Sequence, residues 1–274
     1  MPTIFFITLG STKKKTPNNK IMKTNCLNVT WLALAILSLT LYSCKEDEKY
    51  EIVKQTSGIT GSLSWTLTED NVIIISGNGA MPDYEYDSKK VVVNSPWYGN
   101  RIVIESVEMD SGITRIGNYA FAYCLGLRKI TFPVNVTSIG NSAFVNCLSL
   151  TGDIALPDSV KTVGEWAFFS CFGLTGIVFP EGIKQISHRI LSNCSSLKTV
   201  TIPSSVKVVR EWAFAACDAL EEITIKSVVP PDVYAYAFNG VERTIPVYVP
   251  QESLQAYKNA DTWKEFTNLQ VKAF

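Results

Sequence analysis

The sequence predicts a β-solenoid, in which similar coils stack so that their short strands form a parallel ladder. Three observations predict this fold class. One hydrophobic pattern recurs with a period of 23–24 residues, a proline marks most joins between repeats, and apolar residues alternate with others just before each proline. A single repeat would leave much of its apolar surface in water, so stacked neighbours must complete the core. With 274 residues, 46% of them hydrophobic, the chain can bury such a core.

The repeats follow the pattern P-x-x-V-x-x-I-G-x-x-A-F-x-x-C-x-x-L-x-x-I-x-I, in five clear copies and a sixth degenerate copy within residues 106–241. Each repeat is expected to contain a short strand, such as residues 127–132 or 197–202. The strand ends at the proline, which cannot donate to a ladder. A second extended piece and a compact A-F-x-x-C turn complete the coil. The central column contains Phe121, Phe144, Phe168, Leu191, Phe214 and Phe238.

A cysteine follows the central residue by three positions in five repeats, giving the column Cys124, Cys147, Cys171, Cys194 and Cys217. Stacked one per repeat, these thiols would form a row rather than converge tetrahedrally, which disfavours zinc. Their expected spacing would allow disulfides between neighbours. However, five is an odd number, and a repeated position indicates one repeated packing role. We therefore predict structural thiols and no metal site.

This repeat signature resembles the BspA-like branch of the leucine-rich repeat family, whose members are largely cell-surface proteins. The resemblance extends over residues 58–274. It implies a leucine-rich repeat solenoid at residues 106–241, with short parallel strands joined by compact turns or 3-10 segments. It also implies a β-rich N-terminal cap at residues 58–105 and an α+β cap at residues 242–274. Such caps cover ladder ends that would otherwise pair with other strands.

The flanking sequences carry this resemblance as well. Residues 62–67 and 72–76 resemble the leading β-hairpin of the family. At the other end, residues 245–250, followed by Tyr257 and Trp263, resemble its closing unit.

Residues 1–43 are predicted to be a signal peptide with a spurious N-terminal extension, so that translation begins at Met22. Basic residues precede an apolar run at residues 31–41, and this run is shorter than the roughly 20 residues of a membrane-spanning helix. The run ends in L-Y-S-C, which resembles a lipobox with a bulky tyrosine in place of the usual small residue. We therefore predict that Cys44 is lipidated and anchors the protein in a membrane.

Residues 44–57 are predicted to be a charged tether. The stretch K-E-D-E-K at residues 45–49 cannot bury apolar surface and would hold the domain off a membrane. It also resembles the tag that directs lipoproteins of some Gram-negative anaerobes to the outer face of the outer membrane. Display on the cell surface is the preferred prediction, and an orientation towards the periplasm is the alternative.

Charge and motif content disfavour several functional classes. From Cys44 onward the chain has 20 basic and 25 acidic residues, so no basic field indicates nucleic-acid binding. No phosphate-binding or nucleophile motif is present, and no cofactor is predicted. The one histidine, His188, falls in a column expected to be exposed, together with Asn118, Asn141, Glu165 and Glu211. The sequence therefore predicts a protein without catalytic residues.

Two surface columns are candidates for ligand binding. The residue before each A-F pair gives the first, and Arg189 is expected to lie between the indoles of Trp166 and Trp212. Structural packing and a ligand platform both explain this column. The second flanks the central apolar position of each strand and suits protein recognition. The candidates are Tyr119, Trp166, Arg189, Trp212 and Tyr236 in the first column, and Lys129, Thr131, Thr199, Thr201, Glu222 and Thr224 in the second.

Taken together, these features predict a non-catalytic surface lipoprotein that binds a macromolecule. The resemblance implies adhesion, with a host matrix protein, a cell-surface protein or another bacterial surface protein as the partner. The alternative is a glycan-binding lipoprotein that serves polysaccharide capture through Trp166 and Trp212, since flat aromatic rings suit sugars as well as proteins.

Overall fold

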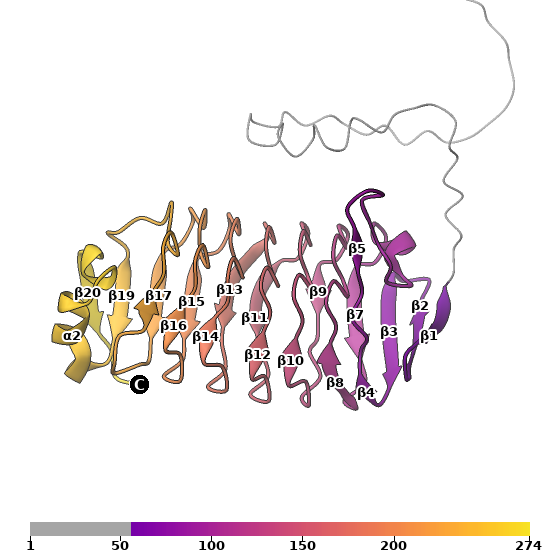
Figure 1. Cartoon of the computed structure of the whole chain (residues 1–274), viewed down its shortest axis with the longest axis horizontal. Coiled ribbons are helices and arrows are strands. Elements are labelled where there is room, and N and C mark those ends of the chain that lie inside the picture. The colour runs from indigo at the N-terminus through magenta and orange to yellow at the C-terminus, as the bar shows by residue number, and fades with distance from the viewer. Residues whose placement is uncertain (1–55) are drawn as a thin grey trace, which may run out of the picture. The chain divides into compact units, whose positions relative to one another are not determined.

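The computed structural model describes residues 56–274. The predicted signal peptide, the start at Met22, the lipidated Cys44 and nearly all of the tether lie outside the described residues. Within them, successive coils stack side by side along one axis, as Figure 1 shows. This arrangement confirms the predicted solenoid.

Each coil contributes short strands to the stack, and a few helical turns occur in the caps (Figure 1). In chain order, the elements are β1 (Ser57–Thr60), β2 (Leu63–Leu67), β3 (Val72–Gly77), β4 (Gly79–Ala80), β5 (Tyr86–Asp87), β6 (Val92–Val93), η2 (Tyr98–Asn100), β7 (Ser106–Met109), β8 (Ile113–Ile116), β9 (Lys129–Ile130), β10 (Ser138–Ile139), β11 (Gly152–Ala155), β12 (Thr162–Val163), β13 (Leu174–Val178), β14 (Gln185–Ile186), β15 (Thr199–Ile202), β16 (Val208–Val209), β17 (Glu222–Ile225), β18 (Asp232–Val233), β19 (Pro246–Val249), η3 (Gln251–Ser253), α2 (Leu254–Asn259), η4 (Trp263–Glu265) and β20 (Asn268–Val271).

Parallel ladders run along two sides of the stack. The longer strands pair in the order β11-β13-β15-β17-β19-β20. On the other side, the strands pair in the orders β12-β10-β8-β4 and β14-β16-β18, and all of these except β8 have two residues. Equivalent residues of neighbouring repeats are register partners, as with Val200 and Ile223. Residues that are one period apart in the sequence therefore lie side by side in the ladder.

A column of stacked aromatic rings forms the centre of the core. Ring centroids of successive phenylalanines lie 5.2 Å apart between Phe144 and Phe168, and 5.3 Å apart between Phe214 and Phe238. Buried tryptophans close the column at both ends. Trp97 stacks on the first phenylalanine at 5.4 Å, and Trp263 meets the last edge-on at 5.4 Å.

Both caps have the architecture that the sequence predicts. At the N-terminal end, β2 and β3 form an antiparallel hairpin, and β3 then pairs in parallel with the first repeat strand, β7. At the C-terminal end, α2 is followed by β20, which pairs in parallel with β19. The side chains of Tyr257 and Trp263 are buried beneath this closing unit.

The strands are shorter than the sequence predicts. Within the expected strand 127–132 the ladder includes only β9, and within 197–202 it includes only β15. The leucine that begins each expected strand belongs to the preceding turn. Leu127 donates its N–H to the carbonyl of Cys124 at 3.1 Å, and Leu197 donates to Cys194 at 3.0 Å. An amide that closes a turn cannot also join the ladder.

The cysteine column lines the inside of the turns. All five thiols are free and buried, and four donate to a backbone carbonyl of the preceding repeat, as Cys171 does to Phe144 at 3.3 Å. Burial raises the pKa of Cys124 and of Cys171 to about 12. These contacts agree with the packing role predicted for the column. Among the described residues, no group of acidic, histidine and cysteine side chains could hold a metal ion.

Candidate functional site

The A-F-x-x-C turns place one side chain per repeat on the same surface, which we call the turn face. The residue before each A-F pair has a left-handed backbone, with φ between 51° and 61°, at Tyr119, Ser142, Trp166, Arg189, Trp212 and Tyr236. This conformation costs a non-glycine residue on the order of 1 kcal/mol. Hydrogen bonds between turns offset the cost, since the first five of these residues donate their N–H to the next repeat, as Trp166 does to His188 at 3.0 Å.

Four consecutive side chains of the turn face stack on one another, and we call them the aromatic ridge. The guanidinium carbon of Arg189 lies 4.7 Å from the ring centre of Trp166 and 5.0 Å from that of Trp212. The Trp212 ring stacks in turn on Tyr236 at 4.5 Å. The cation between two indoles is therefore present as predicted. Tyr236 is 61% exposed and the other three are half-buried, so the ridge presents both aromatic and cationic surface.

Arg189 has no counter-ion in the part of the chain that the structure describes. It forms no ion pair with any described residue, although seven other pairs occur there. Its Nε is buried and has no hydrogen-bond partner among these residues. The two indoles replace much of the water around the charge, because their ring faces carry negative potential.

A hollow of about 270 Å³ lies at the N-terminal end of the ridge. Ser142 occupies the turn-face position here, and its short side chain leaves space between Tyr119 and Trp166. The walls are mostly aromatic and carry no charged side chain. They consist of Tyr86, Tyr119, Tyr123, Ser142, Val145, Asn146, Trp166 and Phe169.

Several of these wall residues were not among the candidates that the sequence indicated. Tyr86 comes from the N-terminal cap, and its ring stacks on Tyr119 at 6.2 Å and on Tyr123 at 5.9 Å. Tyr123 and Phe169 occupy the variable positions of A-F-x-x-C, where aromatic residues were the available signal. Burial, followed by the neighbouring Tyr86 hydroxyl, raises the pKa of Tyr123 to about 12, while Asn146 acts to lower it. The phenol is therefore a neutral hydroxyl at physiological pH.

The second candidate surface, along the longer strands, is less distinctive. Lys129, Thr131 and Thr199 are exposed, whereas Thr201 and Glu222 are half-buried. The prediction that Thr224 is accessible was wrong, because this residue is only 5% exposed. Its register partner is Tyr248 of the closing unit, and a large side chain beside a small one on the same sheet face restricts access.

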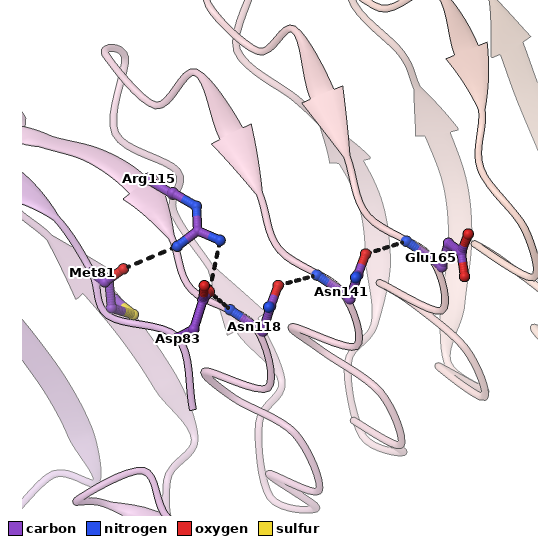
Figure 2. Close-up of polar contacts among 6 residues, drawn as sticks. All are labelled: Met81, Asp83, Arg115, Asn118, Asn141 and Glu165. Atoms are coloured by element: carbon purple, nitrogen blue, oxygen red, sulfur yellow. Dashed lines mark hydrogen bonds and ion pairs between the residues drawn. The ribbon is translucent and has the colours of Figure 1, made fainter. Parts of the chain in front are cut away.

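The column that contains His188 has a structural role in its first rungs, which Figure 2 shows. Asn118 donates its N–H to Asp83 at 2.7 Å, and its side-chain Oδ1 accepts the N–H of Asn141 at 2.7 Å. Asn141 accepts the N–H of Glu165 in the same way, at 2.9 Å. We call this chain the asparagine ladder. The predicted exposure is confirmed for Asn141 and Glu165 and was wrong for Asn118, which is half-buried. The bridging of repeats by the asparagine side chains was not predicted.

Asp83 of the N-terminal cap supplies the first rung of the ladder. Arg115 donates to its Oδ1 at 2.6 Å and forms the ion pair drawn in Figure 2. Burial acts to raise the pKa of Asp83, but the N–H of Asn118 and the Arg115 guanidinium together hold it below its ordinary value. The cap is therefore joined to the repeats by the same bond that joins one repeat to the next.

The ladder ends at Glu165, beyond which the column changes to His188 and Glu211. His188 is half-buried rather than exposed. Its Nδ1 lies 3.9 Å from a carboxylate oxygen of Glu211, and its ring meets the edge of Trp166 at 5.8 Å. An open polar hollow is lined by Glu165, Gln185, His188, Arg210 and Glu211. Its lining is mixed in charge and is built from side chains that already contact one another.

Comparison with known families agrees with this architecture. The sequence profile of the BspA-type leucine-rich repeat region matches in six copies, over residues 93–221 and 152–260, which together cover more than half of the chain. The chain belongs to the BspA-type leucine-rich repeat family. Leucine-rich repeat proteins of this type are generally non-enzymatic. Membership of the family is consistent with a general role in protein binding or adhesion. No curated protein sequence matches the chain significantly.

Among solved structures, leucine-rich repeat proteins are similar to this chain, and one of them shares its fold at a TM-score above 0.5. A leucine-rich repeat protein from Eubacterium ventriosum is 24% identical with a TM-score of 0.54, over 72% of this chain and 66% of its own. The chain thus spans just under two thirds of that protein. The T. pallidum leucine-rich repeat protein is 23% identical with a TM-score of 0.45, over 77% of this chain and 95% of its own. Because the Eubacterium ventriosum protein is less than 25% identical, its similarity to this chain shows a shared fold and nothing more.

The aromatic ridge and its hollow are the most distinctive candidate binding surfaces of this BspA-type solenoid. Trp166 belongs to both, since it lines the hollow and contacts Arg189. None of the helices in the described part of the chain is long and apolar enough to cross a membrane.

Proposed function

We propose that this protein is a non-catalytic, lipid-anchored surface protein that binds a macromolecular ligand through the turn face. The ligand is a host matrix or cell-surface protein, or a protein on another bacterium. The observation that carries the proposal is the half-exposed ridge in which Arg189 lies between Trp166 and Trp212. Tryptophan, tyrosine and arginine are the residues that most often dominate the binding energy of protein interfaces.

The rigidity of the ridge supports the proposal. Its side chains stack on one another, and the backbones of Trp166, Arg189 and Trp212 are tied to the next repeat by hydrogen bonds. Side chains held in this way lose little conformational entropy when a partner binds, so more of the contact energy remains as affinity. Cell-surface display is supported by the family and by the predicted lipid anchor at Cys44, with a periplasmic orientation as the alternative.

The experiment is a binding assay of the full-length, detergent-solubilised protein against immobilised matrix proteins and, in parallel, a glycan array. The double variant Trp166→Ala/Trp212→Ala should weaken binding to the protein ligand by about 2 kcal/mol or more, or roughly 30-fold. The control is Thr199→Ala on the strand surface, which should bind like the wild type. Loss of binding in the control alone would move the site to the strands.

Glycan capture is the second candidate, because the hollow beside Ser142 is bordered by aromatic rings and hydroxyl groups. Binding on the glycan array but not to any protein, with the same dependence on Trp166, would favour this function over adhesion.

A further inference from the structure

The ridge shows what fits between two aromatic rings of the turn face that are two repeats apart. Between Trp166 and Trp212 this interval is filled by the guanidinium of Arg189, at 4.7 and 5.0 Å from the two ring centres. Two ladder steps amount to about 10 Å. That separation accommodates one planar cation within cation–π distance of both rings.

An equivalent interval occurs two repeats earlier, and no turn-face side chain fills it. Its walls are Tyr119 and Trp166, and the residue between them is Ser142. The backbone there matches that at Arg189, with φ of 53° against 51°. Both residues also donate their N–H to the next repeat, Ser142 at 2.8 Å and Arg189 at 3.2 Å. The two intervals share this backbone geometry and differ in the side chain between the rings. The interval at Ser142 is also lined by Tyr86 of the cap and by Phe169, whose ring centre lies 4.7 Å from that of Trp166.

We propose that the hollow beside Ser142 binds an arginine side chain of the protein ligand, sandwiched between Tyr119 and Trp166 as Arg189 is between Trp166 and Trp212. This inference rests on the proposed function and deepens it by naming the chemistry that the ligand presents. The ligand's guanidinium would extend the alternation of ring and cation by two repeats, to Tyr119.

The electrostatics of the hollow favour a cation. Its walls contain no charged side chain, and the ring faces of Tyr119 and Trp166 carry negative potential. The hydroxyl oxygen of Tyr123 and the side-chain amide oxygen of Asn146, both lining residues, can accept hydrogen bonds. The chain from Cys44 onward also has five more acidic than basic residues, which favours the approach of a basic segment.

An arginine fits this site better than a lysine. The guanidinium is planar, so it can face both rings at once, and it is more weakly hydrated than an ammonium group. A sugar ring is the competing occupant. It would need several directional hydrogen bonds, and with Ser142 only 8% exposed, Tyr123 and Asn146 are the main polar partners in the lining, whereas the two ring faces suit a planar cation.

The test uses full-length protein labelled with 5-fluorotryptophan, whose Trp166 signal is assigned with Trp166→Phe. The probes are N-acetyl-arginine methylamide, its neutral citrulline counterpart and methyl α-glucoside, followed by ¹⁹F NMR titration. We expect the arginine probe to shift the Trp166 signal saturably. Citrulline should bind about fivefold more weakly, because it keeps the shape but lacks the charge.

Three variants decide whether the hollow is the binding site. Ser142→Arg places the chain's own guanidinium between the rings and should abolish the shift, while the matched Ser142→Ala should retain the wild-type affinity within about twofold. Tyr119→Ala removes one wall and should weaken binding about fivefold, which keeps the test valid should Ser142→Arg fail to fold.

Several results would overturn the inference: no shift of Trp166, equal binding of arginine and citrulline, binding that persists in folded Ser142→Arg, or tighter binding of the glucoside. Such a result would leave the proposed function standing if the macromolecular ligand still required Trp166 and Trp212. Loss of that requirement, with arginine binding intact, would instead contradict the proposed function alone.

Discussion

The guanidinium carbon of Arg189 lies 4.7 Å from the ring centre of Trp166, which belongs to the preceding repeat. Because this contact joins two coils, Arg189→Ala should lower the free energy of unfolding by about 1–2 kcal/mol through lost cation–π and packing contacts. Urea denaturation measures the change. The control is Arg128→Ala, since Arg128 is exposed and lies 3.8 Å from Glu105; it should change stability by less than about 0.5 kcal/mol. Equal losses of stability in the two variants would contradict a stabilising role of Arg189 between the coils.

The asparagine ladder gives a second prediction. Asn141→Ala removes the acceptor of the Glu165 N–H and should lower stability by about 1 kcal/mol, which corresponds to about 2–4 °C in melting temperature for a protein of this size. Asn141→Asp keeps an acceptor oxygen in the same place and is the matched control. Thermal unfolding followed by circular dichroism compares the two. Equal melting temperatures of Asn141→Ala and Asn141→Asp would contradict the structural role of the asparagine ladder.

The buried thiols predict a loss of stability at alkaline pH. Burial raises the pKa of Cys171 to about 12, so the folded state keeps a proton that the unfolded chain releases near pH 9. The stabilisation is complete below about pH 9 and is lost as pH rises towards about 12, by about 1.4 kcal/mol per pH unit for each such thiol. Cys171→Ser keeps a donor for Phe144 but does not titrate in this range. Its stability should therefore fall less steeply, and an unchanged slope in denaturation at pH 8–11 would contradict the buried thiol.

The predicted anchor is tested by Cys44→Ser. Acyl chains contribute about 0.8 kcal/mol per buried CH₂, so their loss should move the protein from the membrane fraction to the soluble fraction. Cys26→Ser is the matched control, because Cys26 precedes the predicted cleavage site and should leave fractionation unchanged. Immunoblotting of separated fractions gives the readout. Retention of Cys44→Ser in the membrane would show that something other than this cysteine holds the protein there.

The fold was predictable because a constant period converts distance along the chain into position in space. Residues one period apart become neighbours about 5 Å apart, so the period alone predicts that a column such as Phe144 and Phe168 is a stack. The strand lengths were not predictable in the same way. Whether the amide of Leu127 closes a turn or joins the ladder depends on hydrogen-bond geometry that the apolar pattern does not encode.

The candidate site was predictable from the sequence in part. Placing Arg189 between Trp166 and Trp212 required only the period and the residue types. The asparagine ladder was not predicted, because an asparagine in a turn is most often a solvated residue. Its bridging role depends on the side-chain oxygen of Asn118 reaching the N–H of Asn141, as in Figure 2.

The sequence alone determined the solenoid, its two caps and the order of side chains along the ridge, because translation from repeat to repeat leaves little freedom. Only the tertiary structure decided that Tyr86 of the cap closes over Tyr119 and Tyr123 and that a hollow remains beside Ser142. Tyr86 lies outside the repeating pattern. Its position depends on the path of the cap, which the packing of the first coil determines and which no period encodes.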